Sequence, residues 1–227
     1  MPELWIIFGV VALVVIVLIV WGVMRERGRD TAMQAAAGQL DLMYERDGRA
    51  LHREPFTSFS LFQAGRRRRF KNLMQGKVNL STDDPDAAIE VYVFDYRYVT
   101  GSHRDHSTYQ QTVAAFHAVG EKLPAFSLQP ENVLHKIGEL LGHQDIDFDH
   151  KPTFSGRFLL RGPDEPAIRK LFTDDVLDFF EKKQGWCVEA GGDWIVVFRK
   201  GKRVEPEKVG EFLREAFEIC TMLAIHF

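Results

Sequence analysis

The hydrophobic pattern of the chain begins with one long, uninterrupted apolar segment. Residues Leu4–Met24 form twenty-one positions with no charged residue and no proline. As an α-helix that rises about 1.5 Å per residue, this segment just crosses a hydrocarbon core of about 30 Å. Trp5 and Trp21 stand near its ends, where indole rings favour the membrane interface. We therefore predict a single transmembrane helix over residues 1–24.

The residues that flank this segment predict its orientation. No positive charge precedes it, whereas Arg25, Arg27 and Arg29 follow it. A basic flank is retained on the cytoplasmic side, and a cleavable signal peptide would carry its positive charge before the apolar core instead. We expect a retained single-pass anchor in the cell (inner) membrane, with the N-terminus outside and the following domain in the cytoplasm. Arg25 and Arg27 then lie at the membrane interface together with Trp5 and Trp21.

A second apolar pattern, with spacings of three and four, predicts a juxtamembrane helical stalk within residues 25–55. It begins at Asp30 or Thr31 and ends near Gly48. Its apolar positions are Met33, Ala36, Ala37, Leu40, Met43 and Tyr44. A helix this short needs a surface to pack on. That surface is the chain's own domain, a second copy of the chain (self-association) or the membrane.

After residue 56 the pattern predicts one cytoplasmic α+β domain that extends to residue 227. A period of two marks strands over 88–100 and 107–119. In the first strand, Tyr92 and Phe94 share a face with Tyr96 and Tyr98, while Val91, Val93 and Val99 share the other. A strand that is apolar on both faces indicates a sheet that is covered on both sides.

The rest of the domain alternates between short strands and helices. We expect strands over 123–128 and 153–161, helices over 130–141, 164–172 and 173–184, a hairpin over 186–199 that turns at Gly191-Gly192, and a long C-terminal helix over 206–223. The fold class is therefore α+β, with antiparallel strands and several helices. By analogy alone, a pleckstrin-homology-like barrel with inserted helices also fits this order.

Charge is unevenly distributed along the chain. Residues 25–80 hold twelve Lys/Arg against six Asp/Glu, whereas residues 81–227 hold seventeen against twenty-five. The basic part contains Arg66, Arg67, Arg68, Arg69, Lys71 and Lys77. A solvated turn or helix surface is the ordinary explanation of such a run. The functional interpretation is a patch that faces anionic lipid headgroups, each basic residue contributing about 1 kcal/mol. Nucleic acid is the poorer partner because the body beyond is acidic and contains no recognised nucleic-acid module.

Candidate catalytic and metal-binding chemistry is sparse. The densest set of possible ligands is His103, His106, His135, His143, Asp145, Asp147, Asp149 and His150, without a recognised zinc spacing. No phosphate-binding loop or nucleophile motif occurs. Cys187 and Cys220 match no metal or redox spacing and are expected to be free thiols, and His117 is expected to be a half-buried sheet residue. We therefore assign no catalytic residue, no metal and no cofactor.

Several short motifs of this chain are similar to motifs of a known group of proteins. They are Phe59-Ser-Leu-Phe62 with Gly65-Arg-Arg-Arg-Arg69, Phe94-Asp-Tyr-Arg-Tyr98 with Thr100-Gly101, Leu123-Pro-Ala-Phe126 with Pro130-Glu-Asn132, Asp145-Ile-Asp-Phe148, and Leu160-Arg-Gly-Pro-Asp-Glu165. The chain resembles a family of bacterial membrane-anchored proteins with one N-terminal span and a cytoplasmic α+β domain of unknown function. The resemblance implies a fold and a location, and no ligand or catalytic residue.

Two functions remain open at this point. The first is a membrane-tethered, non-enzymatic binding or scaffold protein at the cytoplasmic face, whose partners are the bilayer, anionic headgroups and an unidentified protein. The second is a membrane-bound hydrolase or metal-dependent enzyme that uses the His/Asp set. A wet, concave pocket holding several of those histidines would favour the enzyme.

Overall fold

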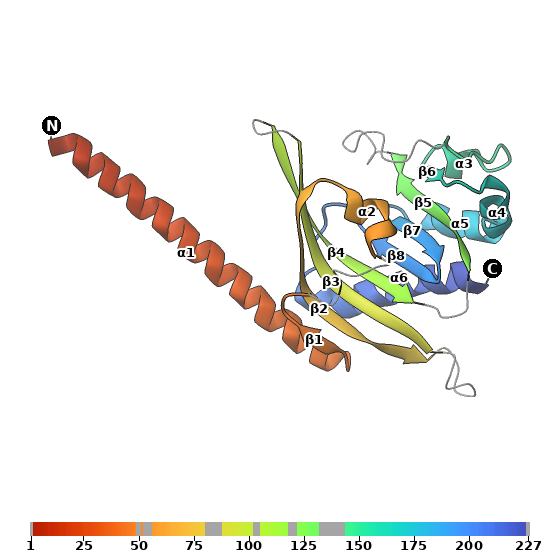
Figure 1. Ribbon diagram of the computed structural model, residues 1–227, viewed down its shortest axis with the longest axis horizontal. Coiled ribbons are helices and arrows are strands. Elements are labelled where there is room, and N and C mark those ends of the chain that lie inside the picture. The colour runs from red at the N-terminus through yellow and green to blue at the C-terminus, as the bar shows by residue number, and fades with distance from the viewer. Residues whose placement is uncertain are drawn as a thin grey trace.

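The computed structural model shows one antiparallel sheet with helices on both faces (Figure 1). It describes residues 2–48, 51, 56–79, 88–101, 105–117, 122–131 and 144–225, with the side chains of 2–11, 79 and 225 left out. The strands are β1 (Met43–Glu45), β2 (Arg66–Asn79), β3 (Ala88–Gly101), β4 (His106–His117), β5 (Leu123–Pro130), β6 (Phe158–Arg161), β7 (Cys187–Gly192) and β8 (Trp194–Phe198). The helices are α1 (Pro2–Gln39), η2 (Phe56–Ser58), α2 (Ser60–Gln63), α3 (Pro152–Ser155), α4 (Glu165–Leu171), α5 (Asp174–Lys182), η4 (Pro206–Lys208) and α6 (Val209–Ile225). The predicted α+β class is confirmed.

The sheet is open, and its strands follow the order β1-β2-β3-β4-β8-β7-β5-β6. Every pairing between described neighbours is antiparallel. Strands β1 and β6 form the two edges and do not pair with each other. The strands that the structure describes therefore form an open sheet and not the barrel considered as an alternative.

Both faces of the sheet are covered, as the pattern of β3 predicts. Val91 and Val93 belong to a core on which α1, α4, α5 and α6 pack, while Phe94, Tyr96 and Tyr98 belong to a second, aromatic core. The η2–α2 segment supplies Phe56, Phe59, Leu61 and Phe62 to that aromatic core. Figure 1 shows α6 and α2 on opposite sides of the sheet. The central strands are apolar on both sides because each side meets its own layer.

Helix α1 is continuous from Pro2 to Gln39, so the expected new helix start at Asp30 does not occur. At about 1.5 Å per residue its 38 residues extend for about 57 Å. Its last turns pack on the domain, where Met33, Ala36 and Ala37 are buried in the first core. This part of the predicted stripe therefore packs on the chain's own domain. The predicted helix end near Gly48 is wrong, because α1 ends at Gln39, and Met43 and Tyr44 lie in strand β1, where Met43 is 67% exposed.

The N-terminal part of α1 projects away from the sheet and the other helices (Figure 1). From Leu13 to Met24, the large apolar side chains are exposed, and Trp21 is 61% exposed. Among the residues whose side chains are described, no helix is both long and apolar enough to cross a membrane.

Several local predictions are wrong. The arginine run was expected in a turn or on a helix, but it begins strand β2. Two bulges in β2, with positive φ at Arg67 (54°) and Asn72 (53°), break the period of two that identifies a strand. Within the expected strand 153–161, residues 153–155 belong to helix α3 (Pro152–Ser155), and only Phe158–Arg161 is a strand. Most of the expected helix 130–141 lies outside the described residues.

Candidate functional site

A cluster of buried polar side chains in the sheet is centred on Asp95 of β3 and includes Asn72 and Thr112. Along this strand, the face that carries Val91 and Val93 continues with Asp95, which is 7% exposed. Burial of an ionised carboxylate is costly unless hydrogen bonds and an opposite charge compensate for it. Asp95 receives both, from α1 and from the two strands beside β3.

Arg29 of α1 binds Asp95 in a bidentate geometry. Its Nε donates to Asp95 Oδ2 and its Nη2 donates to Asp95 Oδ1, both at 2.8 Å. Asn72 Nδ2 donates to Oδ2 and Thr112 Oγ1 donates to Oδ1, each at 3.0 Å. The side chains of Arg29 and Asp95 are 11% and 9% exposed. Although burial disfavours the charge of Arg29, the hydrogen bond to Asp95 and the attraction of that carboxylate raise the pKa of Arg29.

A second ion pair joins α1 to the segment after β8. Arg203 donates through Nη1 to Glu26 Oε1 at 2.9 Å and to Gln110 Oε1 at 2.8 Å, and its Nε lies 3.6 Å from Asp95 Oδ2. The hydrogen bond from Arg203 lowers the pKa of Glu26, so this carboxylate stays ionised. Residues from five separate stretches of the chain therefore meet where α1 leaves the domain.

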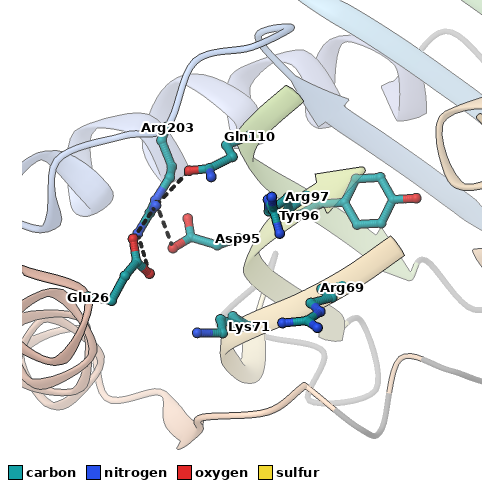
Figure 2. A pocket seen from close by; sticks show the side chains of 8 residues that line it. All are labelled: Glu26, Arg69, Lys71, Asp95, Tyr96, Arg97, Gln110 and Arg203. Atoms are coloured by element: carbon teal, nitrogen blue, oxygen red, sulfur yellow. Dashed lines mark hydrogen bonds and ion pairs between the residues drawn. The ribbon is translucent and has the colours of Figure 1, made fainter. Parts of the chain in front are cut away.

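A pocket opens beside these ion pairs (Figure 2). Its volume is about 270 Å³, and it is lined by Glu26, Arg69, Lys71, Asp95, Tyr96, Arg97, Gln110 and Arg203. In the sheet, Arg69 lies directly opposite Arg97, and Lys71 lies directly opposite Asp95. Figure 2 shows Arg69 and Lys71 on β2 across the same space from Arg203. The pocket is therefore rich in cations.

The six residues of the predicted basic patch fall into four groups in the structure. Arg66 Nη1 donates to Gly101 O at 2.7 Å, and Arg68 donates to backbone carbonyls of residues 63–65, so both side chains support the start of β2. Lys77 lies toward the other end of the strand, 3.6 Å from Glu90. Arg69 and Lys71 face the pocket, and Arg67 is exposed. The patch as a lipid-facing surface stays a prediction.

The residues predicted at the membrane interface all lie on α1. The guanidinium of Arg25 lies 5.7 Å from the centroid of the Trp21 ring, and Arg27 is exposed. The side chain of Trp5 lies outside the described residues. Arg25 and Trp21 are thus neighbours on the exposed part of the helix.

The predicted His/Asp set is only partly within the described residues, because His103, His135 and His143 lie outside them. His106 is exposed at the start of β4, and His150 Nε2 lies 2.9 Å from Asp174 Oδ1. Asp145 accepts a hydrogen bond from Leu160 N at 2.8 Å, and burial raises its pKa. Asp147 and Asp149 are exposed. In the described part of the chain, no group of three His, Cys, Asp or Glu residues is arranged to hold a metal ion.

Other titratable side chains have structural roles. His117, half-buried as predicted, lies 2.8 Å from Asp193 Oδ2 and stacks on Trp194. Cys187 and Cys220 are buried free thiols, and burial raises the pKa of each to about 12. Such thiols are inert at neutral pH.

One buried carboxylate lies on the opposite face of the sheet. Glu189 of β7 is 2% exposed and accepts hydrogen bonds from Ser60 Oγ at 2.6 Å and Leu61 N at 3.1 Å. Burial raises its pKa, although the hydrogen bonds from Ser60 and Leu61 oppose that shift. It attaches the first turn of α2 to the sheet.

No sequence pattern assigned a site role to the residues at the centre of this site, which are Arg29, Asp95, Arg97, Gln110 and Arg203. One signal was present, since Asp95 interrupts the aliphatic face of a strand that is otherwise apolar on both sides. A charge at such a core-facing position needs a partner. No sequence pattern near Asp95 indicates that its partner is Arg29, which lies 66 positions away in the chain.

Comparisons with known proteins find a similarity of fold and no similarity of sequence family. No protein-family model and no curated protein matches the sequence. Among solved structures, the fold is similar to that of the mycobacterial trehalose monomycolate transport factor A, TtfA, with a TM-score of 0.60. The match covers 87% of this chain and 95% of that chain at 13% sequence identity. At this identity the similarity establishes the fold alone.

Proposed function

We propose that this chain is a single-pass membrane protein whose α+β domain is a non-enzymatic binding or scaffold module at the cytoplasmic face of the inner membrane. The observation that carries the proposal is helix α1. One end is apolar and exposed from Leu13 to Met24, and the other is attached to the sheet by Arg29 and Asp95. A contiguous exposed apolar surface marks a contact with a membrane or a protein. The apolar run of Leu4–Met24 favours the membrane.

The continuity of α1 would limit how the domain can be oriented relative to the membrane. A helix without a break transmits its orientation, and two ion pairs join it to β3 and to the Arg203 segment. In a flexible tether, the domain would sample all orientations to the bilayer. Here, α1 presents the same side of the domain to the membrane, which suits a scaffold that must face its partners.

The structural relative suggests a context for such a module. TtfA is named as a transport factor for trehalose monomycolate. We propose by analogy of fold that this chain serves a membrane transport process as an accessory binding protein. The resemblance to bacterial membrane-anchored proteins described above points to the same location. The basic residues of β2 then lie close to anionic headgroups, which attract them electrostatically.

The tether is tested with the full-length chain in bacterial cells. We expect the protein to remain in the membrane pellet after carbonate extraction, and a C-terminal reporter that works only in the cytoplasm to be active. Leu13→Arg with Val17→Arg places two charges in the apolar run, each costing about 2.5–3.5 kcal/mol at the centre of a span, and should release the protein. The matched control is Gln34→Arg, at an exposed position of the same helix.

Two results would contradict the proposal. One is extraction of the unaltered protein by carbonate, which would show that α1 does not span the bilayer. The other is reporter activity on the outer side of the membrane, which would reverse the orientation predicted from Arg25, Arg27 and Arg29.

A further inference from the structure

We infer that the pocket beside Asp95 binds the phosphoryl group of an anionic lipid headgroup. The side chains of Arg69, Lys71 and Arg97 donate hydrogen bonds to this group. The inference deepens the proposed function by naming a ligand, and its lipid source rests on that function. The binding chemistry rests on the pocket alone.

Two like charges are paired unfavourably across the strands that line the pocket. Arg69 and Arg97 lie directly opposite each other on neighbouring antiparallel strands, and Lys71 lies two residues farther along β2. Like charges directly opposite in a sheet are destabilising. Arg97 Nε is also buried with no hydrogen-bond partner among the described residues. A bound anion between the strands removes both costs.

The carboxylates of the pocket already have partners. Asp95 is bound by Arg29, and Glu26 is bound by Arg203. Counting the lining side chains, four cations face two carboxylates, so the pocket keeps a net charge of about +2. Guanidinium groups match the geometry of phosphoryl oxygens, to which they donate two parallel N–H bonds.

The size and position of the pocket favour a lipid as the source of the phosphoryl group. At about 270 Å³ the pocket is smaller than the roughly 300–1,000 Å³ of typical sites for drug-sized ligands, so it suits a headgroup rather than a whole lipid. A wider groove of about 670 Å³ shares Glu26, Gln110 and Arg203 with it. That groove is also lined by Trp21 and Arg25, the residues predicted at the membrane interface. Acyl chains can therefore remain in the bilayer while the headgroup enters the pocket.

The test uses the full-length protein in a mild non-ionic detergent. Native mass spectrometry measures how much phosphatidylglycerol is retained, and diacylglycerol with the same acyl chains is the phosphate-free control. Thermal melting with inorganic phosphate or glycerol 3-phosphate, at constant ionic strength, measures recognition of a free phosphoryl group. The variants are Arg97→Gln and Lys71→Gln. Lys77→Gln is the matched control, because it removes the same charge from β2 outside the pocket.

We expect the unaltered protein and Lys77→Gln to retain phosphatidylglycerol in preference to diacylglycerol. We expect Arg97→Gln and Lys71→Gln to bind it at least tenfold more weakly, since a charge-assisted hydrogen bond is lost. Without ligand, Arg97→Gln should melt no lower than the unaltered protein, because it relieves the repulsion with Arg69. A purely structural arginine would instead lower that melting temperature.

The outcomes separate the site from the tether. If free phosphates raise the melting temperature but phosphatidylglycerol is not retained, the phosphoryl site is supported. The lipid is then the wrong ligand, and a soluble phosphate ester is the right one. If carbonate extracts the protein but the protein still binds phosphate, the proposed membrane anchor is wrong and the phosphoryl site is supported. The inference is overturned if neither lipid nor free phosphate distinguishes the unaltered protein from Arg97→Gln and Lys71→Gln.

Discussion

Replacing Asp95 by asparagine tests the ion pair that attaches α1 to the sheet. The substitution keeps the shape of the side chain but removes its negative charge, and it puts an amide donor beside the donors of Arg29, Asn72 and Thr112. Arg29 is then left as a guanidinium that is 11% exposed and has lost its carboxylate. Breaking a buried ion pair by removing one partner costs about 3–5 kcal/mol.

For a domain of about 150–250 residues, 1 kcal/mol lowers the melting temperature by about 2–4 °C. Asp95→Asn should therefore lower it by about 6–20 °C, measured by thermal melting of the full-length protein in detergent. Glu165→Gln is the control, because it breaks an exposed i,i+4 pair with Arg169 worth about 0.3–0.5 kcal/mol. Arg29→Met combined with Asp95→Asn should cost less than the sum of the two single changes. A melting temperature for Asp95→Asn within about 2 °C of the unaltered protein would refute the reasoning.

Two further predictions concern the cores on the two faces of the sheet. Because the pKa of Glu189 is raised on folding, its contribution to stability is fully present below its ordinary pKa of 4.5 and is lost as pH rises through its folded pKa. The melting temperature should therefore fall above pH 4.5, and Glu189→Gln should make this fall smaller. An equal dependence of the melting temperature on pH in both proteins would contradict the raised pKa of Glu189. Phe212→Ala should lower the free energy of unfolding by about 3–5 kcal/mol, since Phe212 is 4% exposed and stacks on Trp186 at 5.4 Å. Equal melting midpoints for Phe212→Ala and the exposed-site control Arg214→Ala would show that α6 does not complete the core.

Predictions of local structure succeeded where one strong period covers a whole element. The alternation in β3 correctly predicted a strand buried on both faces, and the stripe of α6 predicted its packing. Strand β2 was missed because its bulges at Arg67 and Asn72 break the alternation. The second bulge has a function that local patterning does not reveal, since the side chain of Asn72 reaches Asp95.

Local sequence patterns were enough to predict the α+β class, the long apolar stretch of α1 and the excess of positive charge before residue 80. These follow from the composition and period of neighbouring residues, which set local conformation and burial. The folded chain alone reveals that Arg29, Asp95 and Arg203 meet, and that Arg69 and Arg97 face each other on neighbouring strands. Such contacts depend on the strand register and on where α1 packs. Both are fixed by the whole core rather than by any local segment.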